Sequence, residues 1–321
     1  MDSVDALATA ALNLRIGRAP TPNVIVVSCN EGSNLGRTID NLSTTHPPAC
    51  EIVVVDDNSI DGSATTLDRR PKINMIRTPR RLGVAGARNY GAASANGEVL
   101  VFCDAHIEVD TRWVPLLAEV IRDPRVGLAG PKVCGFSESF LCGYGMVPDE
   151  GLNVHWLPRV DKDPYPVPMI CGAFVAIRRQ LSMECGGFDA GLLQWGLEDL
   201  ELSMHIWAAG YQCMLIPRIV VRFLFRTRQP YRVAAGKILH NVFRVGTVHF
   251  GEHRLTRLRN SRSSDPAATE AEQLLLAGDA KTRQHMIRAH RIHDDDWYFE
   301  TICANRRPIR HCGRRPGGAT Q

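Results

Sequence analysis

An aspartate and a histidine stand two residues apart where an apolar run ends. Residues 99–103 are apolar, and Asp104, Ala105 and His106 follow directly. In an extended chain residues i and i+2 point the same way, so the Asp104 carboxylate and the His106 imidazole can converge on one ion. This pair suits Mn²⁺ or Mg²⁺, with diphosphate oxygens and water completing an octahedral shell. The simpler alternative is a strand cap followed by a surface histidine.

Two adjacent aspartates follow another apolar run. Asp56 and Asp57 come directly after Ile52–Val55. At the carboxyl edge of a parallel sheet, carboxylates face the crevice in which ligands bind, and they can accept hydrogen bonds from a base N–H or from ribose hydroxyls. An Asx turn that caps the next helix explains part of the polar segment 58–63, but two adjacent aspartates are more than a turn requires.

A third acidic pair, Glu198 and Asp199, opens a predicted helix directly after Trp195 and Gly196. The helix dipole favours carboxylates at a helix N-terminus and keeps them ionised, which explains the pair without any function. An ionised carboxylate aimed into a crevice is also well suited to act as a general base.

One arginine lies among small residues. The segment Gly83–Gly91 contains Arg88, whose guanidinium could bind a phosphate through two hydrogen bonds. Tight packing of a helix on a sheet explains the small residues equally well. The first apolar run, 24–27, leads into residues 28–31 without the G-x-G-x-x-G turn of a dinucleotide site, which argues against an NAD or FAD enzyme.

Strands and helices alternate through residues 23–135 and would position these side chains. Short apolar runs predict strands at 24–27, 52–55, 73–76, 99–102 and 126–129, and helices with one apolar face are predicted at 34–42 and 113–121. Runs that are apolar on both sides of the pleat suit central strands of a covered sheet. The alternation predicts a doubly wound α/β fold.

The rest of the chain follows a different pattern. Residues 136–169 are rich in glycine and proline and predict a long irregular excursion over a site. A strand at 170–177, a helix at about 198–209 and a strand at 211–216 are predicted next. Residues from 231 onward are helical in pattern and more polar. Several arginines follow residue 305, and we expect a basic, disordered tail that is solvated or contacts an anionic membrane surface.

Composition places the chain among globular proteins. Its 321 residues are 44% apolar and 22% charged, with a formal net charge of +4. These proportions exclude the disordered and fibrous classes. No apolar run reaches the roughly 18–20 residues that a membrane-spanning helix needs. The sequence has no helix-turn-helix pattern and no basic face interleaved with aromatic residues, so we expect no nucleic-acid partner.

The cysteines predict a reducing environment. Ten cysteines occur, none of them in a C-x-x-C pair, and most stand within apolar runs. We therefore expect buried thiols rather than a disulfide framework or a zinc site. The first twenty residues lack the basic start of a secretory signal, so a cytoplasmic location is expected.

The order of the motifs resembles the family 2 glycosyltransferases. Asn30-Glu31, VDDNSIDGS, GVAGARNYGA, FCDAH and GGFDAGLLQWGLEDLELSMHIWAAGY follow one another within residues 23–225. The DAH motif and the segment from Gly187 to Gly210 are especially similar to the polypeptide N-acetylgalactosaminyltransferases and to the carboxy-terminal module of the galactosyltransferases. The resemblance implies the GT-A fold, a Rossmann-like mixed sheet with helices on both faces, and a nucleotide-diphosphate sugar as donor.

This resemblance also implies a division of the chain. Residues 1–22 would be an N-terminal extension, and residues 23–230 the GT-A domain. Within that domain, 23–135 would bind the nucleotide sugar and 136–230 the acceptor. Residues 231–300 would add a helical extension, and 301–321 the basic tail.

Roles for single residues follow from the same resemblance. Ser28 and Glu31 would lie beside the nucleoside, Asp57 would bind a uracil-type base with Asp56 close by, and Arg88 would lie near the diphosphate.

The remaining motif residues would form the metal, sugar and acceptor sites. Asp104 and His106 would contact ribose and a divalent cation, Mn²⁺ or Mg²⁺. The sugar and acceptor pocket would be lined by Trp195, Gly196, Glu198 and Asp199.

The chain departs from the polypeptide transferases at two places. It has W-G-L-E-D at 195–199 where they have W-G-G-E-N, which is closer to ordinary inverting members and predicts Asp199, beside Glu198, as general base. Their third metal ligand, a histidine in H-V-F-R, has no counterpart in residues 221–226. The third ligand is then His240, water or nothing.

The sequence therefore predicts a metal-assisted, inverting transfer of a sugar from a UDP-sugar to an acceptor nucleophile. The acceptor could be a peptide, a small metabolite, a lipid-linked carrier or a glycan. The alternative is a catalytically inactive relative that binds nucleotide sugars or serves as a scaffold.

Overall fold

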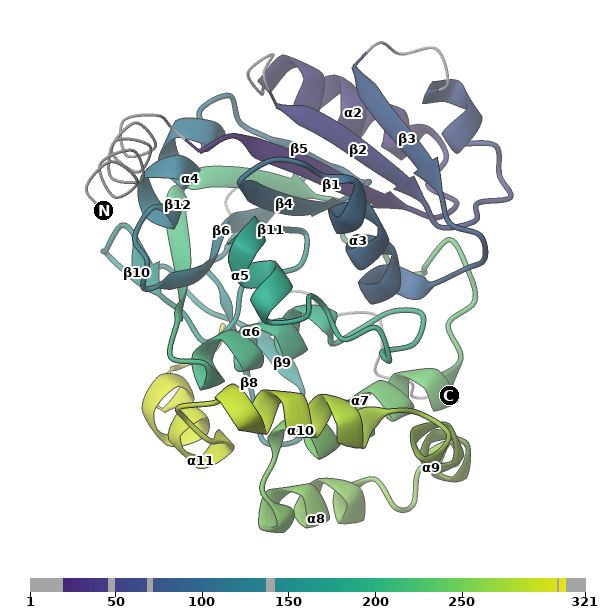
Figure 1. Cartoon of the computed structure of the whole chain (residues 1–321), viewed down its shortest axis with the longest axis vertical. Helices are drawn as coiled ribbons and strands as arrows, with labels where there is room; N and C mark the ends of the chain where they lie inside the picture. The colour runs from purple at the N-terminus through teal and green to yellow at the C-terminus, as the bar shows by residue number, and fades with distance from the viewer. Residues whose placement is uncertain (1–19, 46–49, 68–71, 137–141, 305, 310–321) are drawn as a thin grey trace, which may run out of the picture.

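One large mixed sheet runs through the computed structural model, which describes residues 20–45, 50–67, 72–136, 142–304 and 306–309 (Figure 1). The strand order is β10-β12-β6-β11-β4-β1-β2-β3, with β5 paired to β12 and β7 paired to β6. The strands of this sheet are β1 (Pro22–Ser28), β2 (Glu51–Asp56), β3 (Ile73–Arg77), β4 (Val99–Asp104), β5 (Ile107–Val109), β6 (Val126–Gly135), β7 (Cys142–Gly143), β10 (Tyr165–Pro166), β11 (Phe174–Arg178) and β12 (Gln212–Phe223). A separate hairpin pairs β8 (Met146–Pro148) with β9 (Val154–Trp156).

Strand directions divide the sheet into two parts. Strands β4, β1, β2 and β3 run parallel, so their carboxyl ends meet at one edge. Antiparallel β11 separates them from β6 and β12, which are parallel to each other. The GT-A-like mixed sheet expected from the sequence is confirmed.

Helices cover both faces of the sheet because successive strand residues are apolar on both sides. Val24 and Ile52 point toward α2 (Ser33–Thr45) and α4 (Trp113–Ile121) in one buried cluster. Ile25 and Val53 belong to the cluster on the other face, with α3 (Gly83–Ser94), α5 (Arg179–Glu184) and α6 (Glu198–Ala208). Full burial of one Ile or Val side chain stabilises the folded state by about 1.5–3 kcal/mol relative to leaving that side chain exposed. A short 3₁₀ helix, η1 (Ala64–Leu67), follows β2.

The chain after β12 is helical and packs beneath α6 (Figure 1). It comprises α7 (Ala235–His249), α8 (Glu252–Ser261), α9 (Ala268–Leu276), α10 (Ala280–His290), α11 (Asp295–Trp297) and the π-helix η2 (Tyr298–Cys303). Leu239, Phe243 and Leu275 form its own small core. Arg283 of α10 lies 3.1 Å from the fully buried Glu201 carboxylate of α6, which ties these helices to the sheet domain. Each helix in the described part of the chain is too short or too polar to cross a membrane.

The start of the C-terminal tail differs from the disordered tail that we expected. Residues 301–303 complete η2, and the Ile309 N–H donates to the Trp156 carbonyl at 2.9 Å, so the start of the supposed disordered tail is packed on the domain. Residues 1–19 and 310–321 lie outside the described residues.

The expectation that all cysteines are thiols is wrong for one pair. Cys134 and Cys142 form a disulfide, because the pairing of β7 with β6 places them directly opposite each other. Seven other cysteines of the described chain are not disulfide-bonded. Since disulfides persist in oxidising environments, the cysteines no longer support the expected cytoplasmic location, which stays a prediction.

Candidate active site

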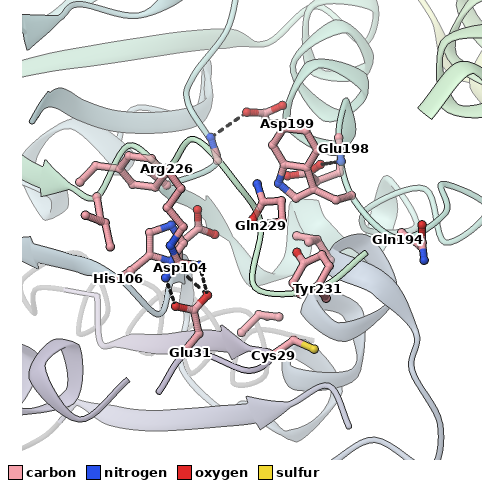
Figure 2. Close-up of a pocket in the computed structure, with 18 of the residues that line it drawn as sticks. Cys29, Glu31, Asp104, His106, Gln194, Glu198, Asp199, Arg226, Gln229 and Tyr231 are labelled. Atoms are coloured by element: carbon pink, nitrogen blue, oxygen red, sulfur yellow. Dashed lines mark hydrogen bonds and ion pairs between the residues drawn. The ribbon is translucent and has the colours of Figure 1, made fainter. Parts of the chain in front are cut away.

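An open cleft lies at the carboxyl edge of β1, β2 and β4 (Figure 2). Its unfilled space, including the part open to solvent, is ≈ 1070 Å³. The residues that line it are Val27, Cys29, Glu31, Asp57, Arg81, Val84, Asp104, His106, Trp156, Cys171, Gly172, Ala173, Gln194, Trp195, Gly196, Glu198, Asp199, Phe223, Leu224, Phe225, Arg226, Gln229 and Tyr231. Most residues predicted from the motifs are among them.

The side chains of Glu31, His106 and Arg226 meet next to Asp104 (Figure 2). The Nδ1 atom of His106 lies 3.3 Å from Oε1 of Glu31. Arg226, which follows β12, donates from Nη1 to the same oxygen at 3.0 Å and from Nη2 to Oε2. Burial opposes ionisation of Glu31, but the hydrogen bonds from His106 and Arg226 outweigh it and lower its pKa. Glu31 is therefore an ionised carboxylate that orients the imidazole.

Asp104 and His106 fit a divalent cation as its two protein ligands. Both line the same cleft, and the Asp104 side chain is 26% exposed. A carboxylate on the second nitrogen of a histidine, as Glu31 is here, is the usual support of a metal-binding imidazole. Carboxylate oxygen and imidazole nitrogen are ligands that Mn²⁺ accepts.

The structure does not bring His240 to this pair. His240 lies in α7, where its Nε2 atom is 3.1 Å from the Gly191 carbonyl oxygen, and it does not line the cleft. In the described ranges, His, Cys, Asp and Glu side chains form no group of three that could hold a metal. Phe223 instead packs on the His106 ring, with centroids 4.8 Å apart. The third ligand predicted at His240 is therefore wrong, because α7 packs on the 189–193 loop and not at the strand edge.

Asp57 lines the cleft, whereas Asp56 and Ser28 do not. Its Oδ1 accepts from Leu82 N–H at 2.7 Å, and its Oδ2 from Gly83 N–H at 2.9 Å. Asp57 thus holds the start of α3 while facing the cleft. Asp56 is buried and accepts from the Ser59 N–H, and Ser28 is 1% exposed. Neither residue lines the cleft, because the strand turns both side chains into the protein.

Glu198 and Asp199 point to the cleft from the first turn of α6 (Figure 2). Glu198 accepts from the Gly196 N–H at 3.1 Å, and Asp199 Oδ2 accepts from the Gly172 N–H at 3.0 Å. Burial and the adjacent charge of Asp199 raise the pKa of Glu198 to about 7. Two acidic groups with different environments are thus available for proton transfer.

The turn that carries Trp195 and Gly196 is conformationally strained. Gln194 and Leu197, which flank them, have φ values of 56° and 70°, a region that side chains rarely adopt. Gly83 explains the tight approach of α3 to this turn, since a Cβ there would lie 2.8 Å from the Gln194 nitrogen. Backbone strain of this kind is concentrated at functional sites, which agrees with the position of the turn in the cleft.

Arg88 is not where a diphosphate could reach it. The side chain is 1% exposed and lies beneath the cleft, paired with Asp104 at 3.1 Å and Glu198 at 3.3 Å. The predicted contact with the diphosphate is therefore wrong for this arginine, because α3 turns it toward the acidic side chains of the site.

The sequence motifs did not predict several residues of the cleft. Arg81 stands at the end of the segment after β3, with its guanidinium 3.9 Å from the centroid of the Tyr231 ring. The basic run at 80–81, directly before Leu82 and Gly83, is the signal that could have found it. Trp156 and Phe225 contact each other edge to face at 6.1 Å between ring centroids and come from segments without a recognisable pattern.

Comparison with known proteins agrees with this geometry. The family model "Glycosyl transferase family 2" matches residues 23–186, and the model "N-terminal domain of galactosyltransferase" matches residues 160–233. The chain therefore belongs to glycosyl transferase family 2, and the two matches together span the cleft-forming elements.

Relatives and a solved structure give the same class. Polypeptide N-acetylgalactosaminyltransferase 11 of Xenopus tropicalis is 30% identical over 263 residues, which cover 73% of this chain and 43% of that protein. Probable N-acetylgalactosaminyltransferase 8 of Caenorhabditis elegans is 28% identical over 319 residues, covering 90% and 73%. The crystal structure of GalNAc-T7 with UDP, GalNAc and Mn²⁺ superimposes with a TM-score of 0.71 at 25% identity, covering 89% of this chain and 57% of that one. The chain spans about half the length of several curated relatives that it matches.

Proposed function

We propose that the protein transfers a sugar from a UDP-sugar to an acceptor nucleophile with the help of a divalent cation. The observation that carries this proposal is the meeting of Asp57, Asp104, His106 and the Glu198–Asp199 pair in one cleft, although they come from three separate segments. The similarity to a transferase solved with UDP and Mn²⁺ supports the same donor class and the same ion.

Each part of the cleft has a distinct chemical task in this proposal. Asp57 accepts a hydrogen bond from the uracil ring, and Asp104 with His106 holds the cation next to the diphosphate. When bound, the cation offsets the charge that develops on the leaving diphosphate. Glu31 and Arg226 keep His106 in the orientation that presents its free ring nitrogen.

We further propose that Asp199 is the general base and that the reaction inverts the anomeric centre. Asp199 lines the cleft at the start of α6, where its carboxylate accepts hydrogen bonds from the Gly172 and Leu200 N–H groups. A carboxylate in this position can take the proton of an acceptor hydroxyl as general base. Direct displacement with such a base gives a β-linked product from an α-linked donor.

Calorimetry with UDP in the presence and absence of Mn²⁺ tests the first part of the proposal. We expect UDP binding that Mn²⁺ strengthens, and Mn²⁺-dependent release of UDP from a UDP-sugar when an acceptor is present. Binding without any turnover over a panel of UDP-sugars and acceptors would instead favour an inactive nucleotide-sugar-binding relative. The NMR signal of the product anomeric proton tests the second part, and an α-linked product from an α-linked donor would contradict inversion.

A further inference from the structure

The buried arginine beneath the cleft connects residues that the proposed mechanism uses separately. Arg88 donates from Nη2 to Oδ1 of Asp104 at 3.1 Å and from Nη1 to Oε1 of Glu198 at 3.3 Å. Asp104 ends strand β4, and Glu198 begins helix α6, so the two carboxylates belong to different elements. A single guanidinium therefore joins the strand that presents the metal ligand to the helix that presents the acidic pair.

Asp199, the third member of the acidic group, is joined to Arg88 through the backbone of one residue, Gly172. Arg88 Nη2 also donates to the Gly172 carbonyl at 2.7 Å, and the Gly172 N–H donates to Asp199 Oδ2 at 3.0 Å. A Cβ at position 172 would be crowded, since it would lie 3.1 Å from Arg88 Nη1 and 3.2 Å from the Asp199 Cβ. The glycine thus favours the close approach of Arg88, Gly172 and Asp199.

The environment keeps this arginine in one orientation. Its side chain is 1% exposed, and its guanidinium carbon lies 5.1 Å from the centroid of the Phe188 ring. Phe188 is held in turn by two hydrogen bonds between its backbone and the Asn89 side chain, at 2.8 and 3.0 Å. A planar guanidinium with fixed donors can bind two carboxylates at once, which an ammonium group at the same place cannot do with the same geometry.

We propose that Arg88 is a positioning residue that sets the metal-binding carboxylate Asp104 and the acidic pair Glu198–Asp199 at a fixed separation. The inference rests on the proposed function of the cleft. It predicts that donor binding and proton transfer are coupled: replacing the Glu198 carboxyl group, which accepts from Arg88, alters how Arg88 holds Asp104 and thereby changes Mn²⁺-dependent UDP binding, although Glu198 is not a ligand of the cation.

Arg88→Lys tests the proposal, because the substitution keeps the positive charge but removes the planar guanidinium that donates to both carboxylates. Arg254→Lys is the matched control. Arg254 has 7% side-chain exposure and pairs with Asp295 and Asp296, but it lies between α8 and α11 and does not line the cleft. For Arg88→Lys we expect the Mn²⁺-dependent gain in UDP affinity to fall at least tenfold and kcat to fall further, with the acceptor KM within about twofold of wild type.

A merely structural role would give a different result. In that case both variants would lower the melting temperature, and both would keep UDP affinity and kcat near wild type in the folded fraction. Arg88→Lys values within threefold of wild type, or an equal loss of kcat in Arg254→Lys, would overturn the proposal.

Glu198→Gln in the full chain is a second variant that applies even if Arg88→Lys does not fold. Its Mn²⁺-dependent UDP affinity is expected to change by threefold or more, measured by calorimetry, and an unchanged affinity would overturn the coupling. The wild type separates the two proposals. A wild type that does not bind UDP would overturn the proposed function together with the role of Arg88, whereas a wild type that binds UDP and an Arg88→Lys variant that matches it overturn only the latter.

Discussion

The two walls of the cleft are built from different chemistry. The wall at the carboxyl edge of β1, β2 and β4 is acidic, and its carboxylates are held by backbone N–H groups or arginines, as Asp57 is by Leu82 and Gly83. The other wall, from β9, the end of β12 and the segment after it, is aromatic, with Phe225 in edge contact with both Trp156 and Phe223.

The difference indicates how a charged donor and an acceptor can share one cleft. Fixed carboxylates bind a nucleotide and a cation by directional contacts, which need a rigid frame of strands and helix ends. Aromatic side chains bind mainly through the apolar contact area that they bury, so they can accommodate varied partners. We therefore expect changes in the acidic wall to alter donor binding and chemistry strongly, and changes in the aromatic wall to alter acceptor binding mildly.

The largest effect should come from Asp104→Ala. Without this carboxylate the cation loses one of its two protein ligands, so we expect Mn²⁺ to have no effect on UDP affinity. Calorimetry with and without Mn²⁺ measures this, and circular dichroism checks that the sheet is intact. A variant that still binds UDP more tightly in the presence of Mn²⁺ would remove Asp104 from the metal site.

The second-largest effect is expected from Asp199→Asn. The amide still accepts hydrogen bonds but cannot take a proton at neutral pH, so kcat should fall by roughly 10² to 10⁴ while donor affinity stays nearly unchanged. Steady-state rates and UDP calorimetry on the same preparation measure both quantities. If kcat is retained, Asp199 serves only to anchor the Gly172 N–H.

Asp57→Ala should weaken UDP and UDP-sugar alike, by about 1–3 kcal/mol, as expected for the loss of a hydrogen bond to a charged group. Because this contact exists in the ground state and the transition state, the loss should appear in KM for the donor. Asp56→Ala is the matched control, since Asp56 is adjacent and buried outside the cleft. Equal KM values in both variants would place Asp57 outside the nucleoside site.

Phe225→Ala should have the smallest effect and act on the other wall. The side chain is 48% exposed, so its loss should cost about 1 kcal/mol of acceptor contact, or roughly fivefold in acceptor KM. Donor KM and kcat should stay within twofold. Leu276→Ala, an 83% exposed apolar residue of α9, is the control for surface truncation. A change confined to donor KM would place the donor, and not the acceptor, against the aromatic wall.

Local patterns were enough to predict the main central strands of the sheet domain, but not β5, α5 or the short strands β7–β10, which lie in a segment expected to be irregular. Short runs such as Val99–Phe102 are apolar on both sides, and the structure uses them as central strands with helices on both faces. The motif residues Asp104, His106, Glu198 and Asp199 were predictable for the same reason, because each stands directly at the end of a strand or the start of a helix. Asp56 and Ser28 were predicted incorrectly, since a one-residue change along a strand reverses the direction of a side chain.

Sequence by itself thus determined which segments form strands and helices and which acidic groups reach the sheet edge, because these depend on neighbours a few residues apart. Tertiary structure decided the partners of those groups. Glu31 meets Arg226 across 195 residues, and Arg88 meets Glu198 across 110. It also excluded His240 from the metal site and added the aromatic wall. Such pairings depend on how whole elements pack, and spacing along the chain carries no information about them.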